Sequence, residues 1–239
     1  MKSLLLLHGF TGAPAVWDGV LSHLPTCTAL RPALGGHGGP LTSWDEEVDR
    51  LLGLLEAHAL EDVHVVGYSM GGRLAYGLLA RRSSRITRAT LIGAHPGLEQ
   101  EADRAARRAA DQGWIDRLAS GLPAFVEAWR ALPMWASQAR VSDETREQRN
   151  AIRLAHDPAG LAHALHAYGL AAMPLAEPET IEVPVTLVAG ELDPKHRTIA
   201  EGLVARFPNA KLAVIAGSGH DVTLEEPAAL ASRIEEMAP

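Results

Sequence analysis

The chain has 239 residues, of which 47% are apolar and 21% charged, a balance typical of one globular domain with a sizeable core. A formal net charge of −7 argues against nucleic acid or an anionic membrane surface as a partner. The apolar run Leu4–Leu7 is too short for a signal peptide, and no stretch approaches the length of a membrane span. With Cys27 as the only cysteine, these features favour a cytoplasmic protein without disulfides.

Short apolar runs, each ending at Gly, Pro or Asp, alternate with longer helical patterns along much of the chain. The runs predict strands at Ser3–Leu7, Thr26–Leu30, Val63–Val66, Ala89–Ile92, Val183–Ala189 and Lys211–Ile215. The helical patterns lie near Ala15–Leu24, Trp44–Ala59, Gly71–Arg82, Thr198–Phe207 and Glu225–Met237. Because continuous apolar strands are covered on both faces, this alternation predicts an α/β fold with a mainly parallel, doubly wound sheet.

The alternation stops between residues 97 and 176, where the sequence is rich in Ala, Arg and Glu and contains no strand candidate. Prolines divide this stretch into several short helices, at Pro123, Pro133, Pro158 and Pro174. We expect residues 97–176 to form a helical cap, inserted into a core domain made of residues 1–96 and 177–239. Every basic residue between Glu99 and Arg153 is arginine, which fits either a solvated helical surface or an anion site.

The strongest local motif is Gly67-Tyr68-Ser69-Met70-Gly71-Gly72, which lies between a predicted strand and a predicted helix. A Gly-x-Ser-x-Gly sequence in this setting is typical of a nucleophile elbow, which exposes the serine oxygen at the carboxyl edge of the sheet. The small residues at 67 and 71 let neighbouring backbone pass close to the turn. We therefore predict Ser69 as the reactive group, with a purely structural turn as the alternative.

A reactive serine needs a base, and the base needs a carboxylate that orients it. In this fold the chain order is Ser, then Asp or Glu, then His. Two acids, Glu191 and Asp193, follow the strand at Val183–Ala189, and we predict Asp193 as the one that orients the base. His220 follows the last strand, so both are predicted at the same sheet edge as Ser69. His8, by contrast, is expected to be a structural turn residue.

A developing negative charge on oxygen needs preorganised donors. The amide of Met70, directly after the serine, is one candidate, and the loop after the first strand offers a second through Phe10. His163 and His166 lie three residues apart on a predicted helix but have no third ligand nearby. We therefore expect neither a metal nor a cofactor.

With this order of Ser, Asp and His, the sequence resembles the α/β-hydrolase superfamily over nearly its whole length. Within it, the chain resembles the 2-succinyl-6-hydroxy-2,4-cyclohexadiene-1-carboxylate synthases, the menaquinone-pathway lyases often called MenH. The arginine after the elbow and pieces of the cap are the more specific part of the likeness. The matching stretches are Leu7–Gly12, Gly67–Arg73, His95–Leu98, Ala105–Arg107, Asp111–Trp114, Trp129–Pro133 and Gly190–Lys195.

The resemblance implies a substrate that carries several carboxylates and from which pyruvate is eliminated. It assigns five side chains to substrate binding, namely Tyr68, Arg73, Arg107, Trp129 and Arg153. Arginine suits this role because its planar fork binds a carboxylate through two parallel hydrogen bonds. Arg104 and Arg108 remain alternatives to Arg107, since neighbouring residues on a helix point in different directions.

Two functions stay open from the sequence. The first is a lyase in which Ser69, made basic by His220 and Asp193, removes a proton from an anionic small molecule. The second is a serine hydrolase with the same triad: a carboxylesterase, thioesterase or carbon–carbon bond hydrolase. A binding protein without turnover is a third alternative, which the complete triad disfavours. In each case we expect a monomer or small homo-oligomer that needs neither nucleic acid nor a membrane.

Overall fold

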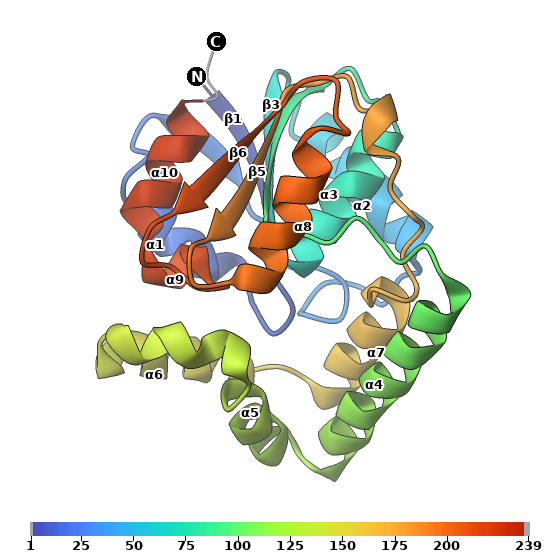
Figure 1. Cartoon of the computed structure of the whole chain (residues 1–239), viewed down its shortest axis with the longest axis vertical. Helices are drawn as coiled ribbons and strands as arrows, with labels where there is room; N and C mark the ends of the chain where they lie inside the picture. Colours follow the sequence, from blue (N-terminus) through green and yellow to red (C-terminus); the bar gives the residue numbers. More distant parts are fainter. Residues whose placement is uncertain (1, 237–239) are drawn as a thin grey trace.

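A single six-stranded sheet runs through the computed structural model, which describes residues 2–236 (Figure 1). Its strands are β1 (Lys2–Leu7), β2 (Cys27–Leu30), β3 (Val63–Tyr68), β4 (Ile86–Ile92), β5 (Val185–Gly190) and β6 (Ala210–Ile215). They lie in the order β2-β1-β3-β4-β5-β6, and every neighbouring pair is parallel. All six predicted strands and the predicted parallel sheet are confirmed.

Helices cover both faces of this sheet, as continuous apolar strands require. The helices α2 (Trp44–Ala57), α3 (Met70–Ala80) and α8 (Pro194–Val204) pack on one face, and α1 (Asp18–Leu21) and α10 (Pro227–Glu235) on the other (Figure 1). Successive residues of a strand point to opposite faces. Accordingly, Leu5 and Leu7 enter the apolar core beneath α2 and α3, whereas Leu4 and Leu6 enter the core beneath α1 and α10.

Three predicted helices differ from those in the structure. The one predicted at Ala15–Leu24 is a 3-10 turn, Pro14–Trp17, followed by the short α1. The one predicted at Thr198–Phe207 begins earlier, at Pro194, because proline suits the first turn and Asp193 caps it. The one predicted at Glu225–Met237 is α10, which begins at Pro227 because proline suits the first turn, while Glu225 ends a separate short helix, α9 (Val222–Glu225). Met237, the predicted end of that helix, lies outside the described residues.

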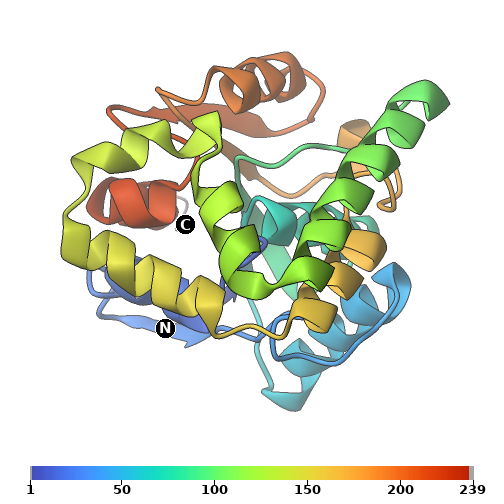
Figure 2. The same ribbon diagram turned by 90° about the horizontal axis from the view of Figure 1, so that it is seen from below.

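The stretch between β4 and β5 is helical, with no strand within it, as predicted. It comprises α4 (Glu101–Ser120), α5 (Leu122–Arg130), a 3-10 helix (Pro133–Arg140), α6 (Asp143–Leu154) and α7 (Pro158–Tyr168), which we call the cap helices. Seen from below in Figure 2, they lie in front of the sheet. They enclose a small apolar core of their own, centred on Phe125 and including Leu118 and Leu161. Among residues 2–236, no helix is long and apolar enough to cross a lipid bilayer.

Two buried histidines tie the loop after β1 to the loop after β2. The Nδ1 atom of His8 lies 2.9 Å from the carbonyl oxygen of Gly9, and its Nε2 atom accepts the amide of Leu34 at 3.2 Å. His37 Nε2 accepts the amide of Thr11 at 3.1 Å. Burial lowers the pKa of His8 to about 4 and holds that of His37 well below its ordinary value. His8 is therefore a neutral structural residue, as expected from its place in the turn.

These histidines predict a loss of stability in mild acid. The unfolded chain takes up a proton at His8 as the pH falls from about 6.5, whereas the folded chain does so only near pH 4. The free energy of unfolding should therefore fall between pH 6.5 and 4, with about 3 kcal/mol of the loss due to His8. Urea unfolding at several pH values measures it. His8→Gln, which stays neutral, should show a shallower dependence, and an unchanged slope would contradict the assignment.

Candidate active site

Ser69 occupies the sharp turn between β3 and α3. Its backbone angles, φ 52° and ψ −107°, lie in a region that residues other than glycine rarely adopt. The turn depends on the glycines around it, because a Cβ on Gly71 would lie 2.2 Å from the carbonyl oxygen of Leu7. A Cβ on Gly67 would lie 2.5 Å from the carbonyl oxygen of Gly71. The close approach of backbone predicted at 67 and 71 is therefore present.

The structure brings His220 and Asp193 to this turn. His220 Nε2 lies 3.3 Å from Ser69 Oγ, and His220 Nδ1 lies 2.6 Å from Asp193 Oδ2. The acid follows β5 and the histidine follows β6, so parallel strands deliver both to one edge of the sheet. The three side chains that the sequence singled out thus form a continuous hydrogen-bonded chain.

The protonation of Asp193 determines the direction of these hydrogen bonds. Burial alone would raise the pKa of Asp193, but hydrogen bonds from His196 and His220 hold it well below its ordinary value. An ionised carboxylate only accepts hydrogen bonds, so Nδ1 of His220 carries a proton and donates a hydrogen bond to Asp193. In the neutral imidazole, Nε2 is then the acceptor for the hydroxyl of Ser69. This is the arrangement that a base next to a serine requires.

His196 also contacts Asp193, and the sequence reasoning missed it. Its Nδ1 atom lies 2.7 Å from Asp193 Oδ2, and its ring centroid lies 4.4 Å from that of His220. A sequence signal for it was available. Asp193-Pro194 at a strand end predicts the start of a helix capped by Asp193, and residue 196, in the first turn of that helix, then lies next to the capping carboxylate. Within residues 2–236, Asp193, His196 and His220 also have the spacing to hold a metal ion, with ligand atoms within 4.8 Å of one another. An ion bound there would be coordinated by the Asp193 and His220 atoms that form the hydrogen bond of the triad.

A cavity of about 260 Å³ opens above Ser69, between the sheet edge and the cap helices. It is lined by most of the predicted site residues: Phe10, Tyr68, Ser69, Met70, Arg73, Arg107, Trp129 and His220. Met70 is the first residue of α3, so its amide lies among those that no helical carbonyl can accept. Gly9 lies directly against the serine, since a Cβ there would be 3.4 Å from Ser69 Cβ. The loop that carries Gly9 and Phe10 therefore borders Ser69, and the oxyanion role of the Phe10 amide stays a prediction.

Two arginines give the cavity a positive wall. Arg73 donates from Nη2 to the carbonyl oxygen of Tyr168 at 3.0 Å, while its buried Nε has no hydrogen-bond partner among the residues described. Burial and the neighbouring charge of Arg107 lower the pKa of Arg73 to about 9, against the opposing effect of Asp111. Arg107 donates from Nε to Asp111 Oδ1 at 2.9 Å. Two guanidinium groups thus share one internal carboxylate.

The structure resolves which arginine of α4 faces the cavity. Arg108 pairs with Glu101, and both side chains are exposed. Arg104 donates from Nη1 to the carbonyl oxygens of Ala171 and Met173, each at 3.1 Å. Arg107 lines the cavity, and neither of the other two does.

Aromatic rings form the side of the cavity that the cap helices supply. Trp129 stacks on Phe125 at a centroid distance of 5.7 Å and meets Phe10 edge-on at 5.3 Å. Trp114 and Trp135 line the same space, as does the exposed Lys195 at the start of α8. Sequence reasoning did not single out Trp135 or Lys195, because nothing in their local patterns separates them from ordinary cap or helix residues.

Arg153 is the one predicted substrate residue outside this cavity. It is buried, donates from Nη1 to Asn150 at 2.8 Å, and lies with its Cζ 5.5 Å from the ring centre of Trp135. It lines a neighbouring cavity of about 300 Å³ together with Arg130 and Arg146. Trp135 lines both cavities, so its ring stands between Arg153 and the space above Ser69.

Known proteins resemble this chain in fold and in sequence. Residues 4–233 match the alpha/beta hydrolase family. The chain is 30% identical to the 2-succinyl-6-hydroxy-2,4-cyclohexadiene-1-carboxylate synthase of Salmonella agona (strain SL483), covering 98% of this chain and 93% of that protein. Among solved structures, MenH from S. aureus superposes with a TM-score of 0.92 at 28% identity, covering 99% of this chain and 92% of the other.

Esterases superpose as well. A thermophilic esterase from Thermogutta terrifontis, solved with malate bound, gives a TM-score of 0.85 at 22% identity and covers 99% of this chain and 89% of its own. That likeness shows the fold alone, whereas the family match and the Salmonella relative span nearly the whole chain. The chain belongs to the alpha/beta hydrolase family, and its predicted resemblance to the 2-succinyl-6-hydroxy-2,4-cyclohexadiene-1-carboxylate synthases is confirmed.

Proposed function

We propose that this enzyme is a lyase that eliminates pyruvate from a polycarboxylated cyclohexene, as a 2-succinyl-6-hydroxy-2,4-cyclohexadiene-1-carboxylate synthase of menaquinone biosynthesis. The observation that carries the proposal is the pair Arg73 and Arg107 in the same cavity as Ser69. The product in the relatives' name holds two carboxylates, one on the ring and one on the succinyl arm. A cavity lined by two guanidinium groups suits such an anion far better than a neutral ester.

In this reaction Ser69 acts as a base rather than as a nucleophile. The hydroxyl gives its proton to Nε2 of His220, whose imidazolium form is stabilised by the carboxylate of Asp193. The serine oxygen then removes a proton from a ring carbon of the substrate. No acyl-enzyme forms, because the oxygen bonds to hydrogen and not to a carbonyl carbon.

The electrons of the broken C–H bond form the new ring double bond, and the C–O bond to the leaving group breaks. Pyruvate departs as its enol after its oxygen recovers the proton held by His220. Negative charge that develops on a carbonyl oxygen meets the amides of Phe10 and Met70. These donors, the triad and the arginines supply the catalysis, so we assign no step to a metal or cofactor.

We assign the substrate carboxylates to Arg73 and Arg107. Until an anion arrives, Asp111 holds Arg107 through its Nε, and the carbonyl oxygen of Tyr168 holds Arg73. Tyr68 and Trp129 form the wall against which the ring packs. Arg153 keeps its proposed role in substrate binding only through displacement of the Trp135 ring, which separates it from the main cavity.

The wider organisation follows from the same proposal. Residues 97–176 act as a cap over the site, and residues 1–96 and 177–239 carry the triad. We expect a cytoplasmic monomer or small homo-oligomer that requires neither nucleic acid nor a membrane for turnover.

A serine hydrolase remains the competing function, since the same triad supports acyl transfer. The two separate in one assay series. Pyruvate release from the enzymatically generated pathway intermediate, with little cleavage of neutral short-chain esters, supports the lyase. Fast ester cleavage that survives Arg73→Ala, with no pyruvate release, would establish the hydrolase instead.

The role of Ser69 as the base is tested by removing its hydroxyl. Ser69→Ala should lower pyruvate release by about 10²- to 10⁴-fold, because the positioned base is lost. Thermal unfolding should remain within a few degrees of the wild type, since the backbone turn and not the hydroxyl shapes the elbow. Single-turnover kinetics with the intermediate measure the effect, and near-normal release by the variant would rule out Ser69 as the base.

Two neighbouring arginines of α4 test which side chain binds the substrate carboxylates. Arg107→Ala should raise KM by about 10- to 100-fold, the loss expected for one charge-assisted contact, with a smaller change in kcat. Arg108→Ala removes the same charge from the same helix but from an exposed pair with Glu101, and serves as the matched control. Equal KM values for the two variants would show that Arg107 does not hold the substrate.

A further inference from the structure

The Asp193 carboxylate serves two imidazole rings at once. Its Oδ2 atom lies 2.6 Å from Nδ1 of His220 and 2.7 Å from Nδ1 of His196. Its Oδ1 atom accepts the backbone amide of His196 at 3.3 Å, which caps α8. His196 therefore holds both oxygens of the carboxylate, one through its backbone and one through its ring. The triad described above uses only one of these contacts.

Both rings donate to the shared oxygen. Asp193 is ionised and accepts only, so each Nδ1 atom bonded to it carries a proton. Burial lowers the pKa of His196, the hydrogen bond to Asp193 opposes this, and the charges of His220 and Lys195 lower it further. His196 is accordingly a neutral ring whose N–H points at the same oxygen as that of His220.

A second donor changes what the first one experiences. Each N–H withdraws negative charge from the oxygen, so a carboxylate that already accepts from His196 stabilises a positive charge on His220 less strongly. We propose that His196 is a positioning residue that, through Asp193, lowers the pH at which His220 becomes available as the base. The inference rests on the triad of the proposed function, though not on the identity of the substrate.

Apart from Asp193, the charged and titratable groups around His196 lower its pKa or are neutral. Lys195 lies beside it on α8 and disfavours a positive ring. His95, from the segment after β4, is partly buried, and its pKa is lowered to about 4 by burial and by the nearby positive charges of Lys195, Arg73 and Arg107. Asp193 and His220 are the partners already described. Asp193 is the carboxylate that raises the pKa of His196.

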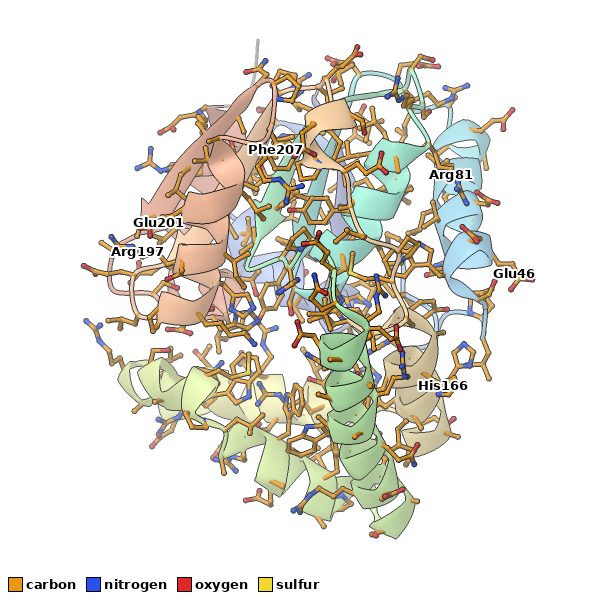
Figure 3. All side chains as sticks on the ribbon, turned by 45° about the vertical axis from the view of Figure 1, so that its right-hand side comes forward. Glu46, Arg81, His166, Arg197, Glu201 and Phe207 are labelled. Atoms are coloured by element: carbon orange, nitrogen blue, oxygen red, sulfur yellow. The ribbon has the colours of Figure 1, made fainter. Side chains whose placement is uncertain are left out.

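Two substitutions at one position separate donation from packing. His196→Leu removes the N–H and fills the space with an apolar side chain. Asp193 should then stabilise a positive His220 more strongly, so the acid limb of the kcat/KM profile should move up by about one pH unit. His196→Asn keeps an N–H where Nδ1 lies, and the limb should return toward the wild-type pH. Arg197→Ala is the control, because Arg197 lies on the outer side of α8 and donates to Glu201 at 2.8 Å (Figure 3).

The outcomes are distinct. A limb that does not move in His196→Leu, or that moves equally in His196→Asn, overturns the proposal, because packing alone would then account for His196. The profiles are measured with pyruvate release and, separately, with whichever ester is cleaved. If only the ester is turned over, the lyase function fails while the role of His196 is still tested.

A spectroscopic measurement covers the case in which His196→Leu does not fold. In the wild type, protein labelled with ¹⁵N-histidine should show two strongly downfield Nδ1–H proton signals, one for each ring bonded to Asp193. His196→Asn should lose one of them and keep the other. A single downfield signal in the wild type would contradict the shared carboxylate without any need for turnover.

Discussion

The carboxylate of Asp193 is the contact on which the site depends. It caps α8, orients His220 and accepts a third donor from His196, so one side chain links the end of β5 to a helix and to the loop after β6. A buried charge is costly unless hydrogen bonds satisfy it, and here three donors surround it. The Asp193 carboxylate can therefore remain ionised at the sheet edge and hold the His220 imidazole in the tautomer whose Nε2 accepts from Ser69.

The elbow depends on backbone packing rather than on side-chain contacts. Ser69 adopts a positive φ because α3 starts so close to β1 and β3 that no Cβ fits at Gly67 or Gly71. Such strain persists only where the surrounding structure overdetermines it. The parallel sheet provides that rigidity, and the loop after β1, held by His8 and His37, provides the opposite wall.

The cap helices decide the character of the cavity. Their aromatic rings line the space above Ser69, and Arg107 adds a second guanidinium to that of Arg73. Burial of Arg73 and the neighbouring charge of Arg107 lower the pKa of Arg73, and the nearby Asp111 offsets this only in part. A site with unmet positive charge favours an anionic ligand, which is the physical reason for preferring a carboxylate-bearing substrate over a neutral one.

Local pattern determined much of this protein. Continuous apolar runs predicted all six strands, and the Gly-x-Ser-x-Gly turn with the order Ser69, Asp193 and His220 predicted the groups that meet at the sheet edge. These signals are readable because each depends on a strand end or on residues adjacent in sequence. Helix starts were less accurate, since the cap on α8 is formed by Asp193 and the break before α10 by a proline.

Only the tertiary structure decided the remaining assignments. Arg104, Arg107 and Arg108 are equivalent in sequence, and the packing of α4 against α7 chose the one that faces the cavity. The structure shows that the ring of His196 contacts Asp193 and that Trp135 separates Arg153 from the main cavity. Helix phase and contacts between distant segments set these positions, and neither is encoded in a short stretch of residues. The sequence thus determined the reactive groups, while packing determined what surrounds them.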